Sequence, residues 1–409
     1  MSLRITRRSF LAGATAVAAT LPFPALAQNK PVKIGLLTVK TGPLAAGGIQ
    51  MEQGTICFLK DRNYTLAGRK VELVVVDTGG NPAGTKTKTQ ELVERDQVDM
   101  IFGPLAAFEL LAITDYTAQA KMPVLSLAAA EDMTQRRPNP YFIRASATSS
   151  QSMHPLADYA VTELKFKRMI TIADDFAFGH EQMAGFGRVF EDGGGRIAKK
   201  LWPPLVTPDY TPYIAQISGA DAVVHGFAGS NPLKFLKQYA DQGVKLPVLG
   251  GSTAGDEALL KSLGDESIGL ISCSPYTGDL DTPSNKKLIE RMVKEYGNIP
   301  GLYSAGLYIN GQVAEAALEK TGGKTDDREA FNKALRAVSL TDTPRGPFSF
   351  DKFGNVVGNF YIRRTERKGD KLVNTTIKTY PKVSQFWTYD EKTFLSQPVY
   401  SRDFPPLKS

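Results

Sequence analysis

The chain has 409 residues, which is enough for two ordinary domains with a sizeable core each. Apolar residues make up 42 % and charged residues 22 %, the balance of a soluble globular protein rather than of a disordered or membrane-embedded one. The net charge of +7 falls to +4 once the three arginines of the first 27 residues are set aside, which is too small to make nucleic acid the expected partner.

Residues 1–27 have the pattern of a cleaved export signal. Three arginines precede an uncharged, apolar stretch that ends in an A-x-A cleavage site at Ala25-Leu26-Ala27. The run Thr6-Arg7-Arg8-Ser9-Phe10-Leu11 resembles a twin-arginine signal, but Ala12 replaces the usual lysine, so the general secretory route stays open. A disordered tail is the alternative. No cysteine lies near the cleavage site, so we expect no lipid anchor and a mature protein in the periplasm.

Strands and helices alternate through the next part of the chain, in units of about 30 residues. The strand-like segments are 32–38, 71–78, 98–104 and 123–128, and the helix-like segments between them are 48–62, 83–96 and 107–121. The alternation restarts with helix-like segments 151–165, 180–194, 231–243 and 256–265 and strand-like segments 168–175, 221–227, 247–251 and 268–276. We therefore expect two successive α/β units with parallel sheets and right-handed crossovers.

The last part of the chain changes from helices to strands. Helices are predicted over 285–297, 304–323 and 326–338, and strands over 346–355, 359–366 and 373–381. A Lys-Gly-Asp-Lys turn at 368–371 predicts a hairpin between the last two strands. The end of the chain, from Trp387, is rich in proline and is predicted to be irregular.

Two segments resemble catalytic or nucleotide-binding loops without matching them. In 79–87 the lysine of a phosphate-binding P-loop is displaced by one residue, and the better explanation is a helix start with Asn81 as cap and Pro82 in the first turn. In 250–254 the pattern of a hydrolase nucleophile elbow is missed by one residue. All three histidines precede Ser252, which excludes a triad in the hydrolase order.

The remaining polar residues give no catalytic or metal pattern. The three histidines and two cysteines are far apart in the sequence, so no metal site and no cofactor are expected. Cys57 and Cys273 are predicted to be buried free thiols rather than a disulfide. Asp174 and Asp175 end a strand, where a pair of acids caps a turn or lines a cleft more often than it catalyses.

The segment 37–48, LTVKTGPLAAGG, joins the first strand to the first helix. Its glycines lie at Gly42, Gly47 and Gly48, which does not fit the G-x-G-x-x-G of a dinucleotide site. What remains is a loop of small residues at the carboxyl end of a parallel strand, the edge at which open α/β sheets bind ligands.

Several stretches, taken in order, resemble one family. KIGLLTVKTGPLA, VELVVVDTGGNPAGT, DMIFGPLAA, MPVLSLAAAEDMT, DDFAFGHE and GPFSFDKFGNVVGNFYIRR together resemble the leucine/branched-chain amino-acid-binding type of ABC-importer solute-binding proteins. The resemblance covers about 350 residues and implies a type I periplasmic binding protein fold, α/β with two Rossmann-like lobes, a three-segment hinge and a ligand cleft between the lobes.

The resemblance also implies boundaries and partners. Lobe 1 would take 31–147 plus 278–345, lobe 2 would take 148–277 plus 346–390, and 391–409 would be an irregular tail. The protein would be a monomer and no enzyme. It would bind a small molecule in the periplasm and deliver it to an inner-membrane ABC permease, without a cofactor, nucleic acid or membrane anchor of its own.

The family's ligand positions fall on unusual residues here. An aromatic residue of the relatives corresponds to Gly47, the hydroxyl residues that hold an α-carboxylate correspond to Ala107 and Ala130, and Ala128 would offer its backbone. The acid that pairs with the α-ammonium falls at Ser252, and a ligand tyrosine falls at Phe178. An aromatic box is expected from a set of ring residues, namely Phe108, Phe178, Phe227, Tyr276 and Tyr303.

These departures predict an aromatic or otherwise apolar carboxylate as ligand, because a buried ammonium without an acid is costly. The acid group would rest on backbone N–H groups and hydroxyls. Lys40 is a weak candidate for a cation partner and is expected to face solvent. Three alternatives stay open: a branched-chain or other neutral amino acid or amide as ligand, a sensor that reports its ligand to a receptor, and an exported hydrolase that depends on Ser252.

Overall fold

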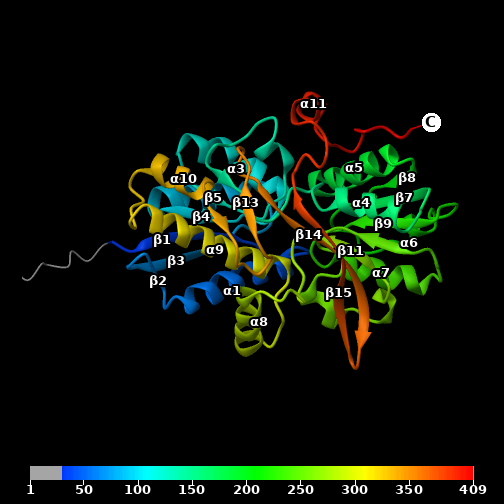
Figure 1. The fold of residues 1–409 in the computed structure, drawn as a ribbon, viewed down its shortest axis with the longest axis horizontal. Coiled ribbons are helices and arrows are strands. Elements are labelled where there is room, and N and C mark those ends of the chain that lie inside the picture. The colour runs from blue at the N-terminus through cyan, green and yellow to red at the C-terminus, as the bar shows by residue number, and fades with distance from the viewer. Residues whose placement is uncertain (1–29, 409) are drawn as a thin grey trace, which may run out of the picture. The chain divides into compact units, whose positions relative to one another are not determined.

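A computed structural model describes residues 30–408 (Figure 1). The predicted export signal, residues 1–27, lies outside the described residues. Within 30–408, no helix is both long and apolar enough to cross a bilayer. Two β-sheets organise the described part, each covered by helices on both faces, and this confirms the predicted α/β class with two lobes.

The first sheet has the strand order β2-β3-β1-β4-β5-β6. Its pairs are parallel apart from the antiparallel hairpin of β2 and β3. The strands are β1 (Val32–Thr38), β2 (Thr65–Leu66), β3 (Arg69–Asp77), β4 (Met100–Phe102), β5 (Val124–Leu125) and β6 (Phe142–Ile143).

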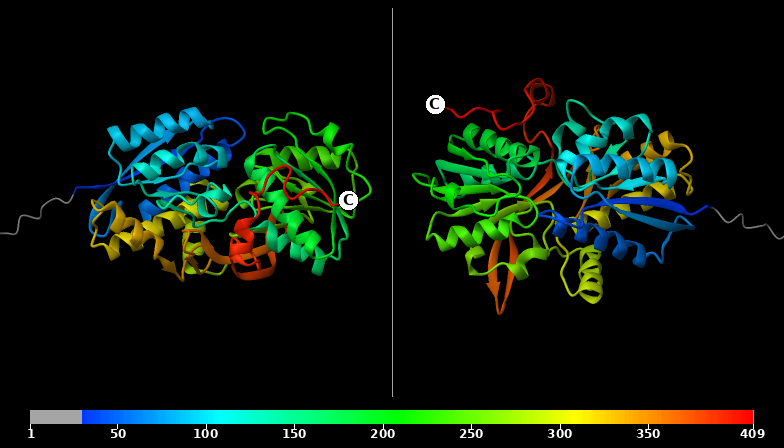
Figure 2. Two further views of the ribbon diagram at one scale, coloured as in Figure 1. Left: turned by 90° about the horizontal axis from the view of Figure 1, so that it is seen from above. Right: turned by 180° about the vertical axis from the view of Figure 1, so that it is seen from behind.

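Helices from two distant parts of the sequence cover this sheet. One face packs on α1 (Ala45–Asp61), α8 (Pro283–Tyr296), α9 (Leu302–Lys320) and α10 (Arg328–Arg336). The other face packs on α2 (Pro82–Gln90), its continuation η1 (Glu91–Arg95) and α3 (Ala107–Gln119). The yellow helices lie beside the blue strands in all views (Figures 1 and 2), although β7 to β11 separate them in sequence.

The second sheet has the order β12-β13-β14-β11-β10-β9-β7-β8, with β15 on β14. The strands are β7 (Arg168–Ala173), β8 (Arg196–Leu201), β9 (Ala222–Gly226), β10 (Val248–Gly250), β11 (Ile271–Ser274), β12 (Ser339–Leu340), β13 (Phe348–Phe350), β14 (Val356–Lys368) and β15 (Lys371–Val383). The first five are parallel, and β14 adds antiparallel to β11. The predicted hairpin is present, because β14 and β15 pair across the turn at 369–370.

The second lobe has its own set of helices. They are α4 (Met153–Thr162), α5 (Ala177–Asp192), α6 (Thr211–Ile214), α7 (Asn231–Asp241) and the 3-10 helices η3 (Glu257–Ser262) and η4 (Asp265–Ser267). Within 256–265 the structure thus has a 3-10 helix where an α-helix was predicted. The strands β2, β6, β8 and β12 were not predicted; three of the four have only two residues, which leaves no periodicity to detect.

Elements on either side of residue 345, the predicted boundary between lobe 1 and lobe 2, pack against the other lobe. β12 lies in the stretch assigned to lobe 1 but pairs with β13 of the second sheet. Conversely, Phe348 and Val356 are buried in the core that covers the first sheet. The exact lobe boundaries therefore stay a prediction.

The C-terminal segment is not wholly irregular, which corrects the sequence analysis. It contains α11 (Glu391–Ser396), whose Phe394 is buried beside Phe386 and Tyr400. Arg136, from the first lobe, donates to the carbonyls of Gln397 (2.8 Å), Phe394 (3.0 Å) and Pro398 (3.2 Å). Packing against folded parts of the chain therefore orders a segment whose composition alone did not predict a helix.

Candidate ligand-binding site

A cavity lies where the carboxyl ends of both sheets' parallel strands meet. It holds about 560 Å³ of empty space, part of which opens to solvent. Its lining residues follow the ends of β1, β4, β5 and β6 of the first sheet and of β7, β9, β10 and β11 of the second; two more come from the start of α9. This is the edge at which open α/β sheets are expected to bind ligands.

No charged side chain lines the cavity, as far as the described residues go. The apolar lining residues are Leu44, Leu105, Ala106, Ala107, Leu127, Ala129, Ala147, Phe176, Phe178, Ala228, Pro275 and Leu302. The hydroxyl-bearing ones are Ser146, Thr148, Ser252, Thr253 and Tyr303. An apolar wall with a few placed polar groups is the usual composition of a small-molecule site.

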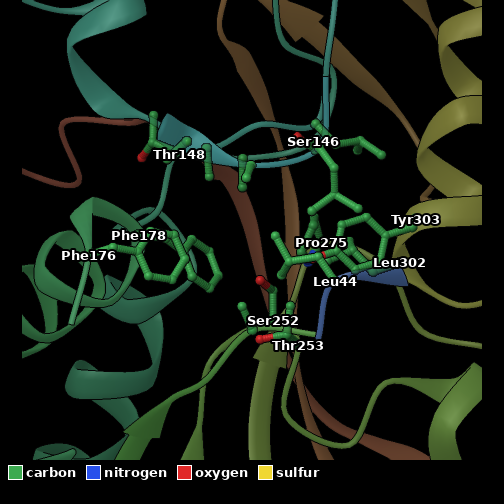
Figure 3. Close-up of a pocket in the computed structure, with 17 residues that line it drawn as sticks. Leu44, Ser146, Thr148, Phe176, Phe178, Ser252, Thr253, Pro275, Leu302 and Tyr303 are labelled. Atoms are coloured by element: carbon green, nitrogen blue, oxygen red, sulfur yellow. The ribbon is translucent and has the colours of Figure 1, made fainter. Parts of the chain in front are cut away.

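Two phenylalanines form one side wall of the cavity. Phe176 is the residue before α5 and Phe178 lies in its first turn; their rings stack with centroids 6.0 Å apart. Phe108, from the first turn of α3, meets Phe176 edge to face at 5.6 Å and supports it from the other lobe. Figure 3 shows Phe176 and Phe178 facing Leu44, Leu302 and Tyr303 across the cavity. An aromatic ring placed between these walls would bury its faces on apolar side chains.

Two buried arginines lie directly behind the part of the wall formed by Ala129, Ser146 and Ala147. Arg144 donates to the carbonyl oxygens of Ala128 (3.1 Å) and Ala130. Arg345 donates to those of Ala145 (2.6 Å) and Ser146 (2.5 Å). Burial lowers the pKa of each guanidinium to about 10, so both remain charged at neutral pH.

These bonds fix the direction of the peptide groups at the wall. In a trans peptide the N–H points away from the C=O that precedes it. The N–H groups of Ala129 and Ala147 are therefore directed away from the arginines, and both residues line the cavity. The hydroxyl of Ser146 is buried and finds no partner within residues 30–408. This wall can donate hydrogen bonds to an anion, and Arg345 places positive charge behind it, whereas the charge of Arg144 is offset by the buried carboxyls of Glu131 and Glu181.

The opposite wall carries Ser252 and Thr253, which follow β10 (Figure 3). Thr253 donates its hydroxyl to the carbonyl of Phe227 at 2.6 Å. Asp256 lies just beyond, and its carboxylate accepts the N–H of Leu302 at 2.7 Å. Burial, and next the charge of Glu257, raise the pKa of Asp256 to about 6. Glu257 itself is paired with Arg363 at 2.8 Å, so the carboxyl of Asp256 is the acidic group left without an ion-pair partner behind this wall, as far as residues 30–408 go.

Hydrogen bonds between the lobes hold the cavity walls together. The bond from Leu302 to Asp256 is one, because α9 covers the first sheet and Asp256 belongs to the second lobe. A second runs from the N–H of Ser230 to the carbonyl of Pro43 at 3.1 Å. Pro43 precedes the cavity residue Leu44, so segment 37–48 forms a wall of the site and contacts the other lobe, in agreement with its predicted place in the cleft.

Of the ten predicted site residues, four line the cavity: Ala107, Phe178, Ser252 and Tyr303. Gly47 lies behind Tyr303, since a Cβ at position 47 would come 3.0 Å from Cε2 of that ring. The ring of Tyr303 thus occupies the space that the missing side chain leaves. Phe108 stands behind Phe176.

The other four are outside the lining. Ala128 and Ala130 flank the lining residue Ala129, but the N–H of Ala128 already donates to Ser126 Oγ (2.9 Å), so the expected donor is shifted by one residue. Tyr276 is fully buried and donates its hydroxyl to Asn285 at 3.0 Å. Phe227 is buried among Tyr210, Phe235 and other core residues of the second lobe. A strand end predicts nearness to the cleft but not the direction of the side chain.

Sequence analysis missed Phe176, Ser146 and Ala147 as lining residues. Phe176 directly follows the acid pair at the end of β7, and this position could have identified it as a residue of the cleft. Ser146 and Ala147 lie in the segment that crosses between lobes, and nothing in their local sequence distinguishes them.

The alternative chemical sites are explained by local structure. Asn81 caps α2 by accepting the N–H of Gly84 at 2.8 Å, as predicted, and Lys40 pairs with Glu52 at 2.9 Å outside the cavity. Asp174 is buried and accepts from the N–H of Ala228 (2.7 Å) and from Asn231 (2.9 Å), which makes it a turn-fixing residue. No cluster of metal-ligating side chains is found in the described range.

Comparison with known proteins finds one family along most of the chain. Residues 31–370 match the family model described as periplasmic binding protein. A protein of Brucella suis biovar 1, named Leu/Ile/Val-binding protein homolog 6, is 30 % identical over 363 residues, which cover 86 % of this chain and 92 % of that protein.

Solved structures agree with this assignment. An ABC transporter substrate-binding protein from Sphaerobacter thermophilus has 32 % identity and a TM-score of 0.81, covering 87 % of this chain and 99 % of its own. A solute-binding protein of an ABC transporter from Rhodopseudomonas palustris BisB5, in complex with 3,4-dihydroxybenzoic acid, has 30 % identity and a TM-score of 0.83, covering 87 % and 98 %.

Proposed function

The chain belongs to the periplasmic binding protein family and is a substrate-binding component of an ABC transporter, and we propose that its ligand is a small aromatic carboxylate. The protein would be exported, close its two lobes on the acid in the periplasm and deliver it to an inner-membrane permease. Members of this family bind and hand over their ligand rather than transform it. Preferential binding to the closed arrangement is what couples ligand to shape.

The observation that carries the proposal is the charge distribution around the cavity. Among residues 30–408 no acidic side chain lines it, so the α-ammonium of an amino acid would be buried without a partner, at a cost of several kcal/mol. A carboxylate, in contrast, can accept hydrogen bonds from the N–H groups of Ala129 and Ala147 and from the Ser146 hydroxyl. These donors lie in front of two charged arginines.

The rest of the cavity suits a ring. Phe176 and Phe178 form one wall and apolar residues the other, which favours an aromatic acid over a small polar one. The aromatic acid bound by the Rhodopseudomonas palustris relative supports the same ligand class.

A neutral or branched-chain amino acid is the second candidate. The name of the Brucella relative favours it, at an identity equal to that of the Rhodopseudomonas palustris protein. The ammonium would then have to reach Asp256, which is buried behind Leu302 rather than exposed to the cavity.

The two candidates are separated by a thermal-shift screen followed by calorimetry on the mature protein. A ligand that binds only the folded state raises the melting temperature, by an amount that grows with concentration. We expect benzoate- or cinnamate-type acids to stabilise the protein and L-leucine to have no effect. Tight binding of L-leucine without response to any aromatic acid would overturn the proposal.

The variant Ser252→Glu tests separately whether the charge around the cavity selects the ligand. This variant places a carboxylate in the cavity at the position that faces the Ser146 wall (Figure 3). Repulsion should abolish binding of aromatic acids, and an amino acid should now find a partner for its ammonium. Unchanged affinity for an aromatic acid would show that the cavity is not where that acid binds.

A further inference from the structure

The cavity is polar at two opposite ends and apolar between them. Ser146 and Thr148 lie at one end and Ser252 and Thr253 at the other, with the phenylalanine wall between (Figure 3). A ligand with one polar group and an otherwise bare ring would match only the first end.

The first end is suited to an anion, as argued above, because its donors stand in front of Arg144 and Arg345. The N-termini of three helices, α3, α5 and α9, also lie at the cavity, although that of α3 already accommodates Glu109, whose carboxylate accepts the N–H of Ala106 at 2.9 Å. The N-terminus of a helix favours negative charge. At α9 that effect is already used, because the carboxylate of Asp256 accepts its first N–H.

The second end is suited to a neutral hydroxyl group. Ser252 is only 8 % exposed, and its hydroxyl makes no hydrogen bond to residues 30–408; the hydroxyl of Tyr303 is equally without a partner there. Asp256 accepts the N–H of Leu302, the residue before Tyr303, at 2.7 Å, so its carboxylate lies close to this part of the cavity. A second ligand carboxylate would be repelled here, whereas an O–H hydrogen would be attracted.

The hydroxyl groups at this end of the cavity are best paired by a hydroxyl group of the ligand. Serine and tyrosine each donate one hydrogen bond and accept others, so a ligand hydroxyl can both give to and receive from them. A bare ring edge would cover the hydroxyls of Ser252 and Tyr303 without pairing them, and an unpaired buried polar group costs more than the bond itself gains.

We propose that Ser252, together with the Tyr303 hydroxyl, selects a hydroxyl substituent on the ring side opposite the ligand carboxylate, so that the ligand is a hydroxylated aromatic acid. This inference rests on the proposed function, because it takes the aromatic carboxylate in this cavity as given. Ser252 is then a specificity-determining residue, because an acidic side chain at the same position would favour an amino acid instead.

Calorimetry with matched ligands tests the inference. The pairs are benzoate against 4-hydroxybenzoate and cinnamate against 4-hydroxycinnamate, with 4-methylbenzoate as a ligand of similar size that lacks the hydroxyl. In at least one pair the wild type should bind the hydroxylated acid about tenfold more tightly, the value of one well-placed buried hydrogen bond. 4-Methylbenzoate should bind no better than benzoate.

Two variants assign the effect to residues. Ser252→Ala should reduce the preference for the hydroxylated acid to within about twofold, and Tyr303→Phe, which keeps the ring, should reduce it in part. Ser396→Ala, on α11 away from the cavity, is the matched control and should keep the wild-type preference. Because two variants are used, failure of one to fold still leaves the inference open to refutation.

The outcomes are distinguishable. If no aromatic acid binds, the proposed function fails and this inference with it. If unsubstituted acids bind as tightly as hydroxylated ones, or if the preference survives in both variants, only this inference is overturned.

Discussion

Two adjacent glycines at the start of α1, Gly47 and Gly48, are predicted to respond very differently to the same substitution. A Cβ at position 47 would lie 2.9 Å from Cδ1 of Leu105 and 3.0 Å from Cε2 of Tyr303. Both atoms are the ends of side chains that can move by a few tenths of an ångström. A Cβ at position 48 would lie 1.8 Å from the carbonyl oxygen of Val39, which is backbone.

The energies follow from these distances. Gly47→Ala gains about 0.5–1 kcal/mol from reduced backbone freedom in the unfolded chain and loses about 1 kcal/mol to overpacking, so its stability should stay within about 1 kcal/mol of wild type. Gly48→Ala must move backbone by about 1 Å and disturbs the bond from the Thr38 hydroxyl to the Gly48 carbonyl. We expect a loss of at least about 3 kcal/mol.

The two variants should also differ in ligand binding. Gly47→Ala pushes Tyr303 toward the cavity, and we expect affinity for an aromatic acid to fall by about five- to tenfold, near 1 kcal/mol. The assays are urea unfolding for stability and calorimetry for binding. Gly187→Ala in α5 is the control, because its Cβ meets only Ile197 at 3.4 Å. It should be slightly stabilising and should not change affinity.

Either of two results would refute this reasoning. If Gly48→Ala were as stable as wild type, the contact with the Val39 carbonyl could not be as described. If Gly47→Ala changed the affinity for aromatic acids no more than Gly187→Ala does, Tyr303 would not be part of the ligand site.

Three further predictions concern other parts of the chain. Arg136→Ala removes the bonds to carbonyls of segment 394–398 and should cost about 1–2 kcal/mol and speed proteolysis of the C-terminal segment, whereas equal proteolysis rates would contradict it. Burial raises the pKa of Asp174 to about 7. In the unfolded chain this carboxyl ionises near pH 4, so folding stability falls as the pH rises from about 4 to about 7, by at most about 4 kcal/mol, and stays at the lower value above that. Asp174→Asn should accordingly gain stability relative to wild type as the pH rises from about 5 to 8, which urea unfolding at several pH values measures; a pH-independent difference would refute the assignment. Cys57 and Cys273 are buried and free, and burial raises the pKa of Cys57 to about 12, so neither should react with a maleimide until the protein is unfolded.

The fold was largely predictable because it rests on local, repeated signals. The long helix α9, the amphipathic helix α10 and buried strands such as β1 and β7 produce sequence patterns that can be recognised without tertiary context. Strands of two residues, such as β2 and β6, carry no such pattern of their own. The helix α11 formed where proline suggested irregular chain, because contacts with Arg136 and the Phe386 cluster outweigh local preference.

What the sequence by itself determined is the alternation of strands and helices, and with it the edge where a ligand would bind. The resemblance to amino-acid-binding proteins, in addition, predicted Ser252 as a ligand-site residue, and Ser252 lines the cavity. Only the tertiary structure decided which side chains face the cavity. Phe227 and Phe178 both follow strand ends, yet one is buried in the core and the other lines the site. The charged groups behind each wall could not be predicted either, because they come from distant parts of the sequence. Arg345 donates to the Ser146 carbonyl, some 200 residues away in the sequence. Such contacts depend on how the chain crosses between the lobes, and no local pattern encodes that path.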